Sequence, residues 1–214
     1  MHKLYYQTVT PLLLDIVEKC MSCQPLEPFR LVGGTALSLQ RGHRRSFDLD
    51  LFTDATYDSI DFKKIESWFR NMFPYVQSDD FLPVGMGKPF FIGENQTNCI
   101  KLDLYYTEAF MENIYVVDGI RLAGIREIIA MKMDLIMRNG RKKDFWDIHE
   151  LMEDYSLEEM LDLHEKRYTY SHDRKLIIRK LTDFQLADDD FEPICLKGKH
   201  WELIKLDLTE ACGL

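Results

Sequence analysis

The 214-residue sequence has no apolar run that approaches the ~18 residues needed to cross a bilayer. Its first residues, MHKLYYQTV, also lack the apolar stretch of a signal peptide. Basic residues are in the minority, with 27 Lys and Arg against 36 Asp and Glu and a formal net charge of −9. This balance argues against indiscriminate binding to nucleic acid or anionic membrane, although an RNA can still be met at a local basic patch. We expect a cytoplasmic protein with no membrane partner.

Cysteine is scarce, and its distribution fits reduced thiols better than a disulfide framework. The five cysteines are odd in number and scattered over the chain. Cys20 and Cys23 form a single CxxC in a helical context, which we interpret as core packing and not as a zinc site. Internal repeats and low-complexity segments are lacking. The 46% hydrophobic content suffices for a core, and the length suits one domain or one domain with a helical extension.

One stretch, FRLVGGTALSLQRGHRRSFDLDLF, organises the chain. It predicts a short strand from Phe29 to Val32, a break at Gly33 and Gly34, a helix beginning near Thr35, and a second strand over residues 47–52. Side chains alternate along a strand, so Phe47, Leu49 and Leu51 are expected on one face, with Asp48 and Asp50 together on the other.

Two carboxylates held side by side on a strand indicate a cation site. Asp48 and Asp50 would repel each other if unpaired, and each would raise the pKa of the other. Gly33 and Gly34 have no Cβ, so a bulky anion such as a triphosphate can approach their backbone. The N-terminus of the helix near Thr35 offers it free N–H groups.

The loop between these elements is basic. It contains Arg41, His43, Arg44 and Arg45, which can offset the phosphate charge of a nucleotide. For Arg41 and Arg44, a solvated loop is an equally good interpretation. His43 is either a base or simply a polar loop residue.

Elsewhere the pattern predicts helices over residues 8–21 and 54–72, and strands over residues 90–92 and 100–106. In IKLDLYY, the face that carries Lys101 also carries Asp103. Asp103 would stand beside Asp48 and Asp50 if the two strands are neighbours. Alternatively, Asp103 is an exposed residue on an edge strand, satisfied by Lys101.

Beyond residue 122 the sequence is helical. Its first helix has an apolar stripe that contains one cation, Lys132; the stripe consists of Ile125, Ile128, Ile129, Leu135 and Ile136. Either the Lys132 stem lies along apolar surface while its ammonium reaches solvent, or the ammonium enters a site and meets phosphate. On both interpretations Lys132→Met is expected to fold. Asp144 is expected to cap the following helix, and Ser156 with Glu159 predicts a capping box.

The Gly-Gly pair followed by Asp-x-Asp resembles the first motif of the polymerase-β-like nucleotidyltransferase superfamily. Within it, GGTAL and GHRRSFDLDLF look like the AbiEii/AbiGii toxin family, and AMKMDLIMRNGRKKDFWDI is similar to a later motif of that family. The resemblance implies transfer of an NMP from an NTP to a hydroxyl acceptor, which is an RNA such as a tRNA, a protein or a small molecule. It also implies two Mg²⁺ or Mn²⁺ ions and a separately encoded antitoxin.

The resemblance assigns roles to particular residues. Asp48, Asp50 and Asp103 would bind metal and Asp103 would be the base, while Lys132 would neutralise the leaving pyrophosphate. The nucleotide would be bound by Gly33, Gly34, Thr35, Arg45, Ser46, Lys132, Arg141, Lys143, Asp144 and Asp147.

The expected fold class is α+β, a mixed nucleotidyltransferase-type sheet with packed helices followed by a helical C-terminal part. We place the nucleotidyltransferase core at residues 1–120 and the helical region that completes the nucleotide site at 121–214. Two alternatives remain open: a catalytically silent protein of this fold that binds a nucleotide or a partner, and a metal-dependent phosphohydrolase.

Overall fold

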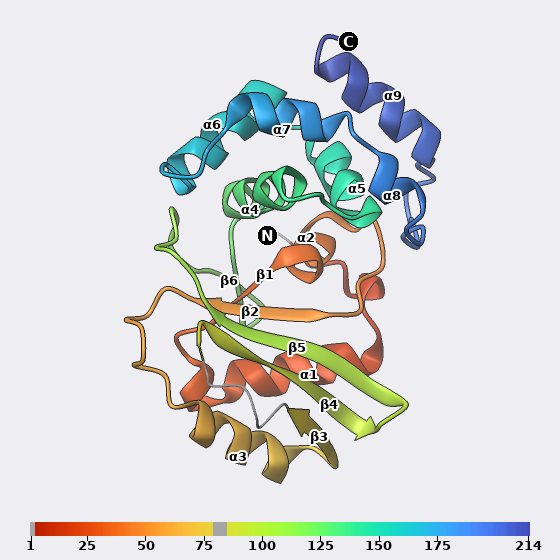
Figure 1. Ribbon diagram of the computed structural model, residues 1–214. Helices are drawn as coiled ribbons and strands as arrows, with labels where there is room; N and C mark the ends of the chain where they lie inside the picture. Colours follow the sequence, from red (N-terminus) through yellow and green to blue (C-terminus); the bar gives the residue numbers. More distant parts are fainter. Residues whose placement is uncertain (1–2, 79–84) are drawn as a thin grey trace.

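In a computed structural model, the described residues, 3–78 and 85–214, form an α+β fold built on one mixed sheet (Figure 1). The strand order is β3-β4-β5-β2-β1-β7-β6. The strands are β1 Arg30–Val32, β2 Leu49–Thr53, β3 Tyr75–Ser78, β4 Gly87–Asn95, β5 Asn98–Tyr106, β6 Tyr115–Val117 and β7 Ile120–Leu122. The central strand β2 runs antiparallel to β1 and parallel to β5.

Helices lie on both sides of this sheet. Helices α1 (Pro11–Ser22) and α3 (Phe62–Met72) lie on one face, and α2 (Gly33–Arg41) with α4 (Ile125–Met137) lies on the other (Figure 1). The C-terminal helices are α5 Lys142–Leu151, α6 Leu157–Arg167, α7 Arg174–Leu181, α8 Gln185–Asp188 and α9 Trp201–Ala211. Helices α5, α6 and α7 contact α4, so the helical half is packed around α4, above the sheet face that carries the acidic residues of β2 and β5.

Capping residues shift two helices from their predicted starts. Helix α1 begins at Pro11 and not at Thr8, because the hydroxyl of its N-cap, Thr10, accepts a hydrogen bond from the backbone of residue 13 at 3.1 Å. Helix α3 begins eight residues later than the predicted start at Asp54. The carboxylate of its N-cap, Asp61, accepts from the backbone of residue 64 at 3.0 Å. Such caps favour an extended conformation for the residue that precedes the helix.

The central strand follows the predicted alternation, but it begins later. Within β2, Leu49 and Leu51 are buried in the core, and Asp50 points to the opposite face. The strand begins at Leu49 and not at Phe47. Phe47 is 47% exposed, so its predicted place on the core face is wrong. The strands β3, β6 and β7 were not predicted, because each has at most four residues and carries little periodic signal.

Helix α2 begins at Gly33, two residues before the predicted start. Gly33 has φ +67°, a left-handed conformation that favours glycine. The chain therefore turns sharply out of β1 and enters the helix at once. This turn places the N-terminus of α2 directly beside β2, with which α2 is in contact.

The helical half agrees with the sequence in most details. The capping box of Ser156 and Glu159 at the start of α6 is confirmed. In α4, Ile128, Ile129 and Ile136 are buried, but Leu135 is 44% exposed, so the predicted stripe is one residue too wide. The strand β7 pairs with β1 and α4 begins at residue 125, so the sheet continues past the proposed boundary at 120.

Candidate active site

Parallel pairing of β2 and β5 brings two of the predicted aspartates together. Asp50 and Asp103 are direct partners in the register. Because β5 lies between β4 and β2, the alternative that Asp103 sits on an edge strand is wrong. Burial, the charge of Asp103 and then that of Asp48 raise the pKa of Asp50 to about 6. The three carboxylates thus form one electrostatic unit on the face of the sheet that carries α2.

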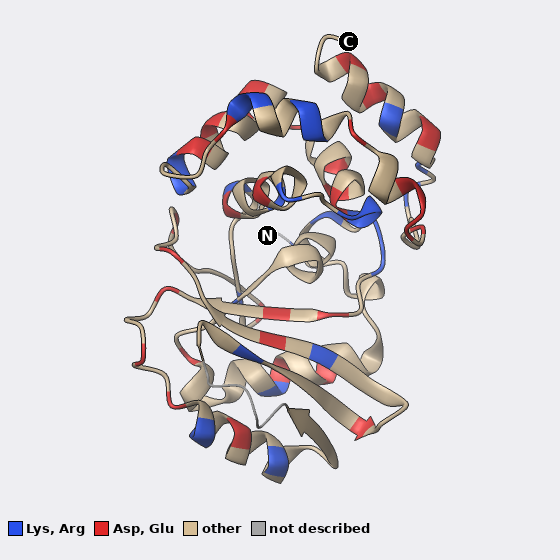
Figure 2. Ribbon diagram, viewed as in Figure 1, with Lys and Arg blue, Asp and Glu red and all other residues tan. Residues whose placement is uncertain are grey.

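Two lysines accompany these aspartates. The Lys101 ammonium lies 2.5 Å from Oδ2 of Asp103, and the Lys143 ammonium lies 3.3 Å from Oδ2 of Asp48. Oδ1 of Asp103 is buried and makes no hydrogen bond to any residue that the structure describes. Asp103 is therefore satisfied on one oxygen only. Figure 2 shows these acidic strand positions and the basic segment between α2 and β2.

The Gly-Gly turn is in close contact with the acidic residues. A Cβ on Gly33 would lie 2.4 Å from Oδ2 of Asp50, and a Cβ on Gly34 would lie 2.5 Å from Nη2 of Arg44. Both distances are far shorter than van der Waals contact, so a side chain at either position would displace the Asp50 carboxylate or the Arg44 guanidinium. The backbone at the start of α2 therefore lies against both a carboxylate and a guanidinium.

Thr35 and Ser46 connect the turn to β2. Their hydroxyls hydrogen bond to each other at 2.8 Å, and the Thr35 hydroxyl also bonds the carbonyl of Asp48. Thr35 is 1% exposed and Ser46 is 6% exposed. For Thr35, the backbone N–H in the first turn of α2 is thus the group that remains for the predicted phosphate contact.

Lys132 belongs to a buried ion-pair cluster. Its ammonium lies 2.6 Å from Oδ1 of Asp144 and 2.7 Å from Oδ2 of Asp147. Arg44 binds both oxygens of Asp147, at 2.6 and 2.7 Å, and Nε2 of His43 lies 2.7 Å from Oδ1. Lys132 is 3% exposed, so the expectation that its ammonium reaches solvent is wrong. The lysine side chain is held between helices α4 and α5.

Mutual attraction stabilises the charges of this cluster. Burial by itself would raise the pKa of Asp147, but the charges of Arg44 and Lys132 hold that pKa well below its usual range. Burial opposes the charge of Lys132, yet Asp144 and Asp147 raise its pKa. Asp144 is the third residue of α5 and not its N-cap, because its carboxylate accepts from the backbone N–H of Arg141 at 2.9 Å.

Sequence reasoning gave too little weight to Arg44 and His43. Both are buried and bound to Asp147, whereas Arg45, the arginine favoured from the resemblance, is exposed. Burial alternates from Arg44 to Phe47, with even-numbered residues inside. Extending the two-residue period back from Asp48 would have placed Arg44 and not Arg45 on the side of the aspartates.

Comparison with known proteins identifies the family. Residues 21–210 match the family described as "Nucleotidyl transferase AbiEii toxin, Type IV TA system". The chain belongs to the AbiEii family. It is also 30% identical over 202 residues, 89% of each chain, to the uncharacterized protein aq_aa25 of Aquifex aeolicus (strain VF5). This AbiEii chain is accordingly a nucleotidyltransferase of a toxin–antitoxin family.

Solved structures agree on the fold. JHP933 from Helicobacter pylori aligns with a TM-score of 0.55 at 22% identity, covering 93% of this chain and 88% of that one. MenT4, a nucleotidyltransferase toxin from Mycobacterium tuberculosis H37Rv, aligns with a TM-score of 0.56 at 12% identity, covering 94% and 83%. At these identities the likeness shows that the AbiEii chain has the nucleotidyltransferase fold.

A cavity of about 230 Å³ lies between the aspartates of the sheet and the buried ion-pair cluster of Lys132. Gly33, Asp50 and Lys132 all line it, so the turn, the strand and α4 face one space. Two of the remaining basic residues lie outside it. Lys143 is half-buried beside Asp48, and Arg141 is exposed and pairs with an aspartate of the C-terminal segment at 3.0 Å.

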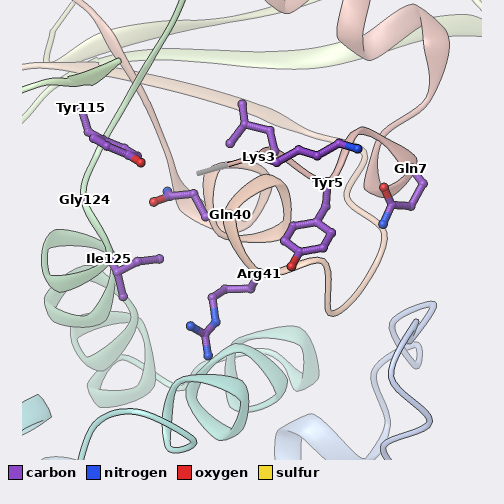
Figure 3. A pocket seen from close by; sticks show the side chains of 9 residues that line it. Lys3, Tyr5, Gln7, Gln40, Arg41, Tyr115, Gly124 and Ile125 are labelled. Carbon is purple, nitrogen blue, oxygen red and sulfur yellow. The ribbon is translucent and has the colours of Figure 1, made fainter. Parts of the chain in front are cut away.

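A larger cavity of about 840 Å³ lies at the other end of α2 (Figure 3). Gln40 and Arg41 of α2, Tyr5 and Tyr115 line it together with Ile125 at the start of α4. The predicted site residues do not line this cavity. The carboxylates and the Gly-Gly turn, and not this larger cavity, therefore define the candidate active site.

Proposed function

We propose that the AbiEii chain transfers an NMP from an NTP to a hydroxyl acceptor with release of pyrophosphate, and that it requires a divalent metal. The observation that carries this proposal is the direct pairing of Asp50 with Asp103 beside a Gly-Gly turn. In the reaction, the acceptor oxygen forms a bond to the α-phosphorus, and the bond from that phosphorus to the bridging oxygen of pyrophosphate breaks. The proton of the hydroxyl passes to a carboxylate.

The donor set fits Mg²⁺ or Mn²⁺. Carboxylate oxygens are the ligands that these cations prefer, and Asp48, Asp50 and Asp103 supply them from one face of the sheet. The raised pKa of Asp50 and the unbonded buried Oδ1 of Asp103 both favour a nearby positive charge. Among the described residues, no three such side chains are already gathered as a metal site. Lys101 and Lys143 pair with two of these carboxylates instead.

When bound, the metal would supply charge that polarises the α-phosphate and activates the attacking oxygen. The protein residues contribute the remaining roles. Asp103 is suited to accept the proton, because one of its oxygens is buried and unbonded. The backbone at Gly33, Gly34 and Thr35 is suited to hold phosphate, since it lies at a helix N-terminus.

The basic residues differ in how freely they can contact the nucleotide. Lys143 is half-buried and only weakly paired with Asp48 at 3.3 Å, so it can leave that carboxylate for the phosphates, whereas Arg45 and Arg141 are exposed. Lys132 borders the cavity with Asp50 but is bound to two carboxylates. Its charge acts on the leaving pyrophosphate from this fixed position.

The proposed activity also implies a partner and a cellular compartment. The family implies a separately encoded antitoxin, and we infer that the toxin acts in the cytoplasm, where NTP, RNA and protein acceptors are present. In the part of the chain that the structure describes, no helix is long and apolar enough to span a membrane.

A labelling experiment tests the proposal. Each of the four NTPs, labelled at the α-phosphate, is incubated with the protein, Mg²⁺, total RNA and total protein. Label is expected in one acceptor fraction, and excess EDTA should abolish it. Asp50→Asn should reduce transfer by orders of magnitude. Asp15→Asn is the control, because Asp15 lies on α1, away from the site, and is paired with Lys19 at 2.7 Å.

The outcomes also separate the alternatives. NTP binding without transfer to any acceptor would indicate the catalytically silent protein. Release of labelled NMP without a covalent product would indicate the phosphohydrolase. Full transfer in EDTA, or by Asp50→Asn, would contradict the metal mechanism.

A further inference from the structure

The chain returns to the candidate active site through the segment between α8 and α9. Residues 194–199, here called the C-terminal strap, lie beside the basic segment between α2 and β2 (Figure 1). The N–H of Arg45 donates to the carbonyl of Ile194 at 2.9 Å. The N–H of Leu196 donates to the carbonyl of His43 at 2.8 Å. Together these two bonds form an isolated antiparallel β-bridge between segments about 150 positions apart in the sequence.

The strap holds the part of the basic segment that carries Arg44. Residues 42–48 belong to no helix and to none of the strands β1 to β7, so contacts with other segments fix their backbone. Nη1 of Arg44 donates to the carbonyl of Arg45 at 3.0 Å, and the N–H of that same residue is bonded to the strap. The other two guanidinium nitrogens of Arg44 bind Asp147, and Nη2 lies against Gly34. A displacement of the strap would therefore move Arg44 relative to the start of α2.

The strap is itself anchored on a buried carboxylate of α5. Glu150 is fully buried, and the ammonium of Lys197 lies 2.5 Å from its Oε1, while that of Lys199 lies 2.9 Å from its Oε2. Burial opposes the charge of Lys197, yet Glu150 raises its pKa. Sγ of Cys195 accepts hydrogen bonds from the backbone N–H groups of both lysines, at 3.4 and 3.3 Å. The strap is thus folded into a turn from which both ammonium groups reach the same carboxylate.

The strap contributes little to the apolar core. Its two large apolar side chains, Ile194 and Leu196, are 51% and 41% exposed. Its contacts are hydrogen bonds and ion pairs, which fix direction but contribute little net stability. Burying a carboxylate such as Glu150 is also costly, and an apolar side chain of similar size would stabilise the same position at least as well. This combination favours a role in orientation over a role in stability.

We propose that Lys197 and Lys199 are positioning residues for nucleotidyl transfer. They act through Glu150 and the backbone of the strap, which holds the Arg44 guanidinium against the turn at Gly34. The inference rests on the proposed binding of phosphate at this turn. If the guanidinium moved, the first N–H groups of α2 would no longer be aligned with the triphosphate, and a misplacement of about 1 Å at a reacting centre can cost on the order of 100-fold in rate.

A proline at position 196 tests the backbone link. Leu196→Pro removes the N–H that donates to His43, whereas Leu196→Ala, the matched control, keeps it. Hydrogen exchange followed by mass spectrometry should show faster exchange across residues 42–48 in Leu196→Pro and wild-type exchange in Leu196→Ala. The affinity for Mg-NTP, measured by calorimetry with each of the four nucleotides, should fall by about 10-fold in the proline variant only.

Removal of one strap charge at a time supplies the second test. Lys197→Gln leaves Glu150 paired with Lys199, so the chain is expected to stay folded. Lys197→Gln and Lys199→Gln should each lower the Mg-NTP affinity by about 3-fold, and Lys197→Arg should retain the affinity because the charge is kept. Lys205→Gln is the matched control, since Lys205 is an ion-paired lysine of α9 that binds Asp188, at 3.0 Å, outside the strap.

The results separate the role of the strap from the reaction itself. Wild-type exchange over residues 42–48 in Leu196→Pro would refute the link between the strap and the basic segment. Faster exchange with wild-type Mg-NTP affinity would refute the positioning role and make the strap purely structural. Strap-dependent Mg-NTP binding without transfer of label by the wild-type protein would refute the proposed reaction while the inference stands. Absence of Mg-NTP binding by the wild-type protein would refute both.

Discussion

Substitution of Lys132 by methionine distinguishes two roles for this lysine. In one, it only packs along the apolar stripe of α4; in the other, its ammonium neutralises buried carboxylates. Methionine fits an apolar stripe, so the sequence predicts that Lys132→Met folds normally. The structure predicts instead that Lys132→Met is destabilised. Loss of the ammonium leaves Asp144 and Asp147 buried, with only Arg44 and His43 of the cluster bound to Asp147.

The magnitude follows from burial. Removing one partner from a buried ion pair costs about 3–5 kcal/mol, because the remaining charge is left uncompensated. For a chain of this length, each kcal/mol shifts the melting temperature by about 2–4 °C, so we expect a loss of roughly 6–20 °C. Lys132→Met with Asp144→Asn should recover part of this loss, since the second change removes one uncompensated carboxylate.

The stability that this ion-pair cluster contributes depends on pH, and the directions of the two pKa shifts fix how. The folded-state pKa of Asp147 is lowered, so its contribution to stability is present above the unfolded pKa near 3.9 and is lost as the pH falls through the folded value. The pKa of Lys132 is raised, so its contribution is present below about 10.4 and is lost as the pH rises through its folded value. The deficit of Lys132→Met should thus be constant from about pH 5 to 9 and shrink below about pH 4.

Urea denaturation of both proteins at pH 3.5, 5, 7 and 9 measures this deficit. Lys143→Met is the matched control, because Lys143 is half-buried and its loss should change stability by less than about 0.5 kcal/mol. A deficit below about 1 kcal/mol at pH 7 for Lys132→Met would refute the ion-pair reasoning.

Three further substitutions test the site. Asp50→Asn should raise the apo melting temperature at pH 8 but not at pH 4, because a folded pKa raised to about 6 costs stability only once the carboxylate ionises; an equal gain at both pH values would contradict this. Gly33→Ala should destabilise more than Gly119→Ala in thermal melts, since both glycines have positive φ but only at Gly33 does the Cβ meet Asp50, at 2.4 Å. Thr35→Val should lower kcat/KM, because the Asp48 carbonyl loses its donor; unchanged kinetics would make that bond incidental.

The local sequence determined the elements that carry the site. Alternation of apolar and acidic residues was enough to separate Leu49 and Leu51 from Asp50 on a strand, because side-chain direction in a strand depends only on sequence parity. The glycine at position 33 marked the turn, since few other residues tolerate its positive φ. The capping box at Ser156 followed from chemistry three residues apart.

Tertiary structure alone decided which charges meet. Asp50 and Asp103 are 53 positions apart, and their contact depends on β5 pairing in parallel with β2, a choice made by the whole sheet. Lys132 has the same helical pattern whether it reaches solvent, phosphate or carboxylates. Its burial follows from the packing of α5 against α4, which brings Asp144 and Asp147 to its ammonium. Local periodicity gives the direction of a side chain, whereas the partner at the end of it depends on how distant elements pack.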